Sequence, residues 1–162
     1  MKLEYRPLLG SKVFEESYGK LTNDEKNLKL KVAKFKEEYE ILRVDNPTFT
    51  EFVLELMEKK KWDRKIFKDR TLLSDSTFTQ IINNFKKGWE HQTVVAIAVG
   101  LELHLYTAEK LLSLAGLCFG ESKEHQAYKF LFTEFRGWAI YECNAFLESV
   151  GVPILGCLHR NS

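Results

Sequence analysis

Residues 62–85, WDRKIFKDRTLLSDSTFTQIINNF, constrain the fold more than any other stretch, because their local signals specify two short helices and the break between them. Asp63 is placed to cap a helix, with Trp62 before the cap and Phe67 four residues after it. Two apolar residues at these positions pack together as a hydrophobic staple. The same pair of signals recurs around Ser74. The sequence therefore predicts two helices separated by a tight break just before Ser74.

The second of these helices, predicted over residues 74–85, has two different faces. At about 100° per residue, one face is apolar and would pack inward; it consists of Phe78, Ile81, Ile82 and Phe85. The opposite face carries only small hydroxyl and amide side chains, and it consists of Ser76, Thr79, Gln80, Asn83 and Asn84. Such side chains can hydrogen-bond to base edges in DNA, although any surface helix also needs a polar face.

An amphipathic helix is predicted over about residues 23–43, in an N-terminal arm. Its apolar residues recur at alternating steps of four and three, flanked by Lys and Glu. They form a seam consisting of Leu28, Val32, Phe35, Tyr39 and Leu42. The seam fits a helix that packs on its own domain, and it also fits a homodimer contact, although it is shorter than the usual coiled coil.

The rest of the chain also shows helical patterns. A capping box at Thr48 opens a helix that ends in the lysine cluster 59–61, whose charges suit either a helix C-terminus or a phosphate. Residues 92–102 are apolar almost all round and predict a buried helix, and Thr107 is placed to cap the next one. Two aromatic-rich helices follow, opening at Ser122 and near residue 139. With no alternating strand pattern, we predict an all-α protein.

Composition limits the classes of function. The 162 residues are 44% hydrophobic and 29% charged, which is typical of a globular domain, and the net charge is +1. Segments 1–46, 47–118 and 119–162 carry +1, +1 and −1, so none has the overall excess of cations common in nucleic-acid-binding proteins. Three widely spaced cysteines predict reduced thiols. With neither a signal peptide nor an apolar run long enough for a membrane span, we expect a soluble, cytoplasmic protein without a membrane partner.

No catalytic, cofactor or metal site is predicted. The four histidines lack metal-ligand spacing, and no glycine-rich phosphate loop or GxSxG motif occurs. Cys143 lies on an apolar helix and is expected in the core. We therefore do not expect an enzyme.

Five predicted helices between Thr48 and Gly116, with "GLELHL" before "TAEKLLSLAG", resemble the XRE-type, lambda-repressor-like helix-turn-helix domain of bacterial and phage proteins. The resemblance implies an all-α five-helix bundle with an N-terminal helical arm and two extra C-terminal helices. The corresponding organisation is an arm at 1–46, a helix-turn-helix domain at 47–118, a helical extension packed on it at 119–156 and a tail at 157–162.

The resemblance also implies a function, which is sequence-specific DNA binding in transcription regulation. The helix at 74–85 would be the recognition helix and would enter the major groove of duplex DNA, with the protein acting as a homodimer. Base contacts and phosphate contacts are expected from the residues Ser76, Thr79, Gln80, Asn83, Asn84, Arg64, Lys65, Lys86 and Lys87.

A second hypothesis is a protein-binding or inhibitor module, for example in phage–host conflict, that keeps the fold without using it on DNA. The near-neutral charge and the aromatic helices at 122–150 favour it. So do Asp63 and Asp69, which bracket the supporting helix where the family usually has a neutral cap and a Gln. Lys68 and Leu72 also stand where the family usually has a small residue and the turn glycine.

Overall fold

The computed structural model describes residues 21–43, 45–84 and 88–156, with side chains from residue 24 onward. Within these ranges the regular structure consists of eight helices and no strands, which confirms the all-α prediction. The chain divides into two compact units, one ending at Arg43 and one beginning at Val44. Among the described helices, none combines the length and apolar character that a membrane span requires.

The first unit contains the long helix α2 (Leu21–Leu42). The helix begins two residues before the predicted start at about residue 23. The seam residues Leu28, Val32, Phe35 and Tyr39 are between 42% and 62% exposed. The rings of Phe35 and Tyr39 stack with centroids 5.9 Å apart. The seam is therefore an exposed apolar stripe along α2.

The second unit begins with helices α3 (Phe49–Lys59) and α4 (Arg64–Thr71), both capped as predicted. At α3, the Glu51 N–H donates to the Thr48 hydroxyl (3.2 Å) and the Thr48 N–H donates to the Glu51 carboxylate (2.8 Å). At α4, the Asp63 carboxylate accepts a hydrogen bond from the Ile66 N–H at 2.8 Å. The side chain of Trp62, before this cap, meets Phe67 edge-on, with ring centroids 6.5 Å apart. Both helix starts are therefore set by contacts between residues close in the chain.

Helix α5 (Asp75–Ile82) starts as predicted but is shorter than the predicted range 74–85. The Ser74 hydroxyl accepts a hydrogen bond from the Thr77 N–H at 3.2 Å and caps the helix. The helix ends at Ile82 because Asn83 is its C-cap and Asn84 has a φ of 51°, so neither is a helical residue. Ile82, predicted on the inner face, is 40% exposed.

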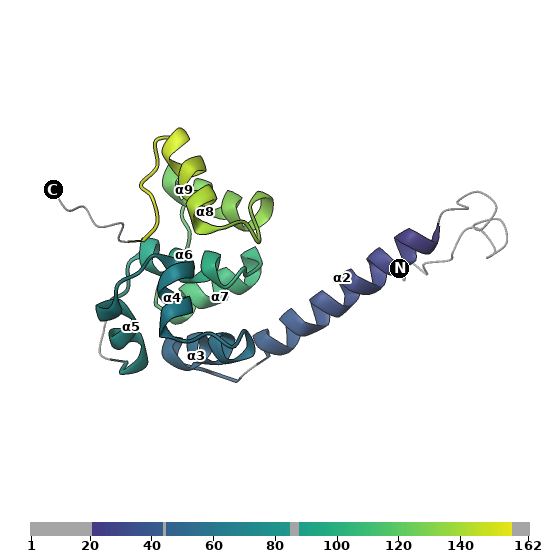
Figure 1. Ribbon diagram of the computed structural model, residues 1–162, viewed down its shortest axis with the longest axis horizontal. Coiled ribbons are helices and arrows are strands. Elements are labelled where there is room, and N and C mark those ends of the chain that lie inside the picture. Colours follow the sequence, from purple (N-terminus) through teal and green to yellow (C-terminus); the bar gives the residue numbers. More distant parts are fainter. Residues whose placement is uncertain (1–20, 44, 85–87, 157–162) are drawn as a thin grey trace, which may run out of the picture. The chain divides into compact units, whose positions relative to one another are not determined.

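Helix α6 (His91–Gly100) forms the centre of the second unit and is buried from Val94 to its end, as its apolar sequence predicts. It packs against α4, α7 (Leu105–Leu114), α8 (Lys123–Glu134) and α9 (Ile140–Ser149) (Figure 1). Helix α4 crosses it closely, since a Cβ on Gly100 would lie 2.8 Å from the carbonyl oxygen of Arg70. Helix α7 begins at Leu105, so the prediction that Thr107 caps it was wrong, and Thr107 is buried in the first turn.

The last two helices are an aromatic-rich pair. The Ser122 hydroxyl accepts from the His125 N–H at 3.2 Å and opens α8, as predicted. Glu142 accepts from the Ala139 N–H at 3.0 Å at the start of α9. Figure 1 shows this pair at the opposite end of the second unit from α3 and α5. After α9 the chain returns, and Gly156 reaches the turn between α4 and α5, where its position is close to Leu72.

Candidate nucleic-acid interface

The polar face of α5 is the centre of the candidate interface. The ring of Phe78 packs on Phe67 of α4 with centroids 5.0 Å apart, and this contact turns the opposite side of α5 outward. Ser76 and Thr79 are exposed there and Gln80 is partly exposed. The Thr79 hydroxyl donates to the Asp75 carbonyl at 2.9 Å, which leaves its oxygen able to accept. Three of the five residues of the predicted polar face therefore share one short helix.

The two asparagines of the predicted polar face lie beyond the end of α5. Asn83 is exposed at the C-cap. Asn84 is also exposed, but its amide oxygen lies 3.3 Å from the hydroxyl of Thr50 on α3. The same hydroxyl donates to the carbonyl of Ile81 at 2.8 Å. Asn83 and Asn84 therefore belong to the turn after α5 and do not continue the polar face of the helix, on which they were predicted.

The candidate interface includes a basic stretch that net charges over long segments did not reveal. Residues 59–70 contain seven Lys or Arg and two Asp. They span the end of α3, the connection and nearly all of α4, the helix on which α5 packs. Counting charge over a window of about twelve residues would have found this stretch from sequence alone. A local excess of cations beside a polar helix is the feature that phosphate binding requires.

Several of these cations already have partners within the protein. The Lys68 ammonium lies 2.9 Å from the Asp75 carboxylate. The Arg64 guanidinium lies over the Phe78 ring, 4.9 Å from its centroid. Lys59 and Lys60 form ion pairs with Glu55 (3.2 Å) and Glu102 (3.6 Å) respectively.

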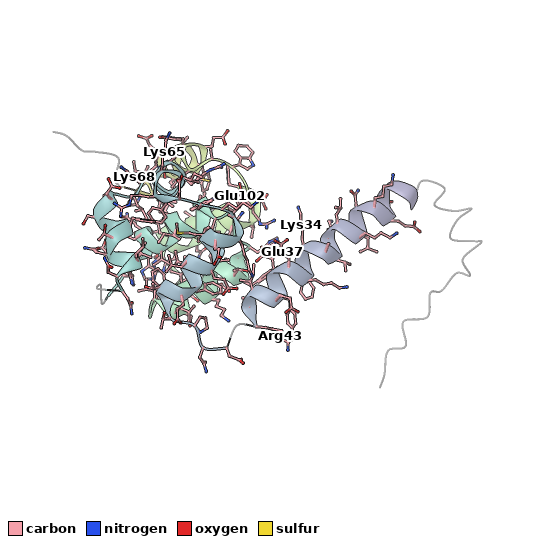
Figure 2. All side chains as sticks on the ribbon, turned by 60° about the horizontal axis from the view of Figure 1, so that its bottom comes forward. Lys34, Glu37, Arg43, Lys65, Lys68 and Glu102 are labelled. Carbon is pink, nitrogen blue, oxygen red and sulfur yellow. The ribbon has the colours of Figure 1, made fainter. Side chains whose placement is uncertain are left out.

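The remaining cations of residues 59–70 are the ones most available to a phosphate. Within the described part of the chain, Lys61, Lys65 and Arg70 form no ion pair, and all three are exposed. Figure 2 shows Lys65 on α4 together with the paired Lys68, one helical turn further along. The predicted contacts Lys86 and Lys87 lie outside the described residues.

Carboxylates stand at the N-termini of both helices. Asp63 satisfies the Ile66 N–H, so this group of the α4 N-terminus is not free for a phosphate. Asp75 occupies the first position of α5, and its side chain is 55% exposed. The hydrogen bond and charge of Lys68, together with the charge of Arg64, hold the pKa of Asp75 below its ordinary value. The carboxylates of Asp63 and Asp75 make both helix N-termini poor anion sites, so the cationic side chains are the better candidates for a phosphate contact.

A second cluster of titratable groups lies where α6 meets α8. The rings of His91 and His125 stack with centroids 4.3 Å apart. His125 Nδ1 accepts a hydrogen bond from the Gly120 N–H at 2.7 Å, and His91 Nε2 lies 2.8 Å from the Cys118 carbonyl oxygen. Burial and the neighbouring His91 lower the pKa of His125. The described residues contain no group of three side chains arranged to hold a metal ion.

A hollow of about 560 Å³ lies along α8 and α9. Its apolar lining includes Phe130 and Phe146, whose rings stack with centroids 5.3 Å apart. Phe130 is 45% exposed. Lys123 and Glu121 are also part of the lining, so the hollow carries one charge of each sign.

Comparison with known proteins finds no match to this chain among protein families, curated proteins or solved structures.

Proposed function

We propose that this protein binds duplex DNA sequence-specifically as a transcription regulator of XRE type. In this proposal α4 and α5 form a helix-turn-helix in a lambda-repressor-like bundle, α4 being the supporting helix and α5 the recognition helix. The observation that carries the proposal is the basic stretch at residues 59–70 beside the polar face of α5.

The division of roles follows from side-chain chemistry. An α-helix with its side chains is about 10–12 Å in diameter, which suits the width of about 12 Å of the major groove. Gln80 can pair bidentately with adenine, and the hydroxyls of Ser76 and Thr79 can serve several bases. Lys65 and Arg70 supply the sequence-independent attraction to phosphate. Lys61 extends this attraction toward α3.

The arm offers a way to pair two such domains. The exposed seam of α2 is self-complementary in its apolar pattern, and two copies could bury it against each other. A dimer would place two recognition helices on a palindromic site. Sedimentation analysis of wild-type protein and a Val32→Glu, Phe35→Glu variant tests the pairing. We expect a dimer for the first and a monomer for the second.

Fluorescence anisotropy with labelled duplexes across a salt series tests DNA binding itself. We expect affinity to fall steeply with salt, because each phosphate contact releases counterions with a slope of about −0.9 in log K against log salt. Lys65→Ala should weaken binding to all sequences and reduce this slope. Gln80→Ala should weaken binding to a selected site more than to random duplex.

A matched control is Lys123→Ala, which removes one exposed positive charge from α8 instead of α4. Its DNA affinity should stay at the wild-type value. Absence of binding by the wild-type protein at about 50 mM salt, where non-specific contacts are strong, would exclude the proposal. Equal losses in Lys65→Ala and Lys123→Ala would exclude α4 as the contact surface.

The second candidate function is a protein-binding module, and the hollow along α8 and α9 is the observation in its favour. The exposed ring of Phe130, stacked on the half-buried Phe146, suits a partner that presents apolar side chains. Phe130→Glu would place a charge in the hollow. Proteins recovered from the source cell's extract by wild-type protein and lost with Phe130→Glu would support this function, and identical recoveries would exclude it.

A further inference from the structure

We propose that residues 152–156, here called the C-terminal strap, brace the turn between α4 and α5, and that Gly156 is a positioning residue for DNA binding. The inference rests on the proposed DNA-binding function, since it assigns to the strap the orientation of the recognition helix. It gives the C-terminal helices a role in the site without any contact with DNA.

The strap is held to α9 by one buried side chain. The side-chain Nδ2 of Asn144 donates to the Leu155 carbonyl at 3.0 Å, and the side-chain Oδ1 of Asn144 accepts from the Leu155 N–H at 2.8 Å. Asn144 is 6% exposed and Leu155 is fully buried. Val152 is also buried. These two hydrogen bonds fix the path of the backbone immediately before Gly156.

At Gly156 the strap packs directly against the turn between α4 and α5, and a side chain would not fit between them. A Cβ added there would lie 2.5 Å from the Leu72 Cβ, and 2.9 Å from the carbonyl oxygens of both Leu72 and Thr71. Gly156 also has a φ of 80°, in the region that favours glycine. Only glycine therefore allows the strap to approach the turn this closely.

A contact at the turn between α4 and α5 can affect the backbone conformation of Leu72 and, through it, the orientation of α5. Leu72 has a φ of 56° and a ψ of 21°, a left-handed conformation that residues with a Cβ rarely adopt. Such a conformation persists when its surroundings hold it. Helix α5 begins three residues later and packs mainly on α3 and α4. The backbone angles at Leu72 therefore set the direction in which Ser76 and Gln80 point.

Two glycine substitutions separate the brace from general backbone strain. Gly156→Ala adds a methyl group that must displace the turn or the strap. Gly151→Ala is the matched control, because Gly151 also has a positive φ (72°), whereas its added Cβ would meet nothing nearer than the Lys123 ammonium at 3.9 Å. Both variants carry the conformational penalty of a left-handed alanine, and only the first touches Leu72.

The experiment measures affinity for a selected duplex together with amide hydrogen exchange. We expect Gly156→Ala to weaken DNA binding by about tenfold, the effect of losing one good base contact, while Gly151→Ala keeps the wild-type affinity. The Leu72 N–H, which donates to the Lys68 carbonyl at 2.9 Å, should exchange faster in Gly156→Ala than in Gly151→Ala. Leu72→Gly in the Gly156→Ala background should restore part of the affinity, because it removes the nearest overlapping atom.

Wild-type affinity and unchanged Leu72 exchange in Gly156→Ala would overturn the brace, and so would equal losses of affinity in the two alanine variants. If wild-type protein binds no DNA, the proposed function fails. Faster Leu72 exchange specific to Gly156→Ala would then support the brace alone. If Gly156→Ala does not fold, Asn144→Ala replaces it, since that variant withdraws both strap hydrogen bonds without adding an atom at the turn. In Asn144→Ala, the affinity for the duplex should fall and the Leu72 N–H should exchange faster. Unchanged values of both would overturn the proposal.

Discussion

Under the proposed DNA-binding function, the ion pair between Lys68 and Asp75 limits the number of cations available to DNA, and Asp75→Asn tests this directly. The Lys68 ammonium is 2.9 Å from the Asp75 carboxylate, across the turn from α4 to α5. Both side chains are at least 43% exposed, so the pair can exchange partners readily. In Asp75→Asn the lysine loses its partner and can bind a phosphate, and a negative charge leaves the start of the recognition helix.

The size of the effect follows from counterion release. One added phosphate contact makes the slope of log K against log salt more negative by about 0.9. When salt is reduced fourfold, the binding constant of the variant should therefore rise by a factor about 3.5 times larger than the rise for the wild-type protein. The assay is anisotropy with one labelled duplex at a series of salt concentrations.

Asp69→Asn is the control, because it removes the same charge from α4. Among the described residues, Asp69 forms no ion pair, so no lysine is released. We expect its salt slope to match that of the wild type. An unchanged slope in Asp75→Asn, or equal changes in the two variants, would refute the role assigned to Lys68.

Three further outcomes are expected. Gly100→Ala should destabilise the protein by about 1–3 kcal/mol in urea unfolding, because its Cβ would overlap the Arg70 carbonyl oxygen; unaltered stability would contradict the close crossing of α4 and α6. Because the pKa of His125 is lowered, the folded state disfavours protonation of this side chain. The melting temperature should therefore be unaffected by His125 above about pH 6.5 and should fall below that pH. In thermal scans, His125→Asn should show a weaker fall. Burial raises the pKa of the Cys143 thiol to about 11, so iodoacetamide at neutral pH should modify the exposed Cys118 before Cys143, as mass spectrometry of the digest would show.

Most helix starts could be predicted from the sequence because each depends on residues three or four positions apart. The caps at Thr48, Asp63, Ser74 and Ser122 all form within one helical turn. The buried stripe of α3 follows from apolar residues at helical spacing, whereas the burial of α6 follows from a sequence that is apolar almost all round. Thr107 is the exception, since helix α7 begins two residues earlier and Thr107 is buried.

The candidate site could be predicted only in part. The polar residues of α5 follow from the helical period, whereas the end of α5 depends on a residue in another helix. The Thr50 hydroxyl bonds the Ile81 carbonyl from 31 positions away. No local pattern around residues 82–84 contains that contact.

The sequence by itself determined that the chain is helical, where most of its helices begin and which face of α5 is polar, because these features arise from neighbours along one chain segment. The tertiary structure alone decided where α5 ends, that Lys68 pairs with Asp75, and that Gly156 lies against Leu72. Each of these depends on the folding of the chain back on itself, which brings together atoms that no helical period relates. The stretch at residues 62–85 is therefore specified locally as two helices, while the angle between them depends on the rest of the domain.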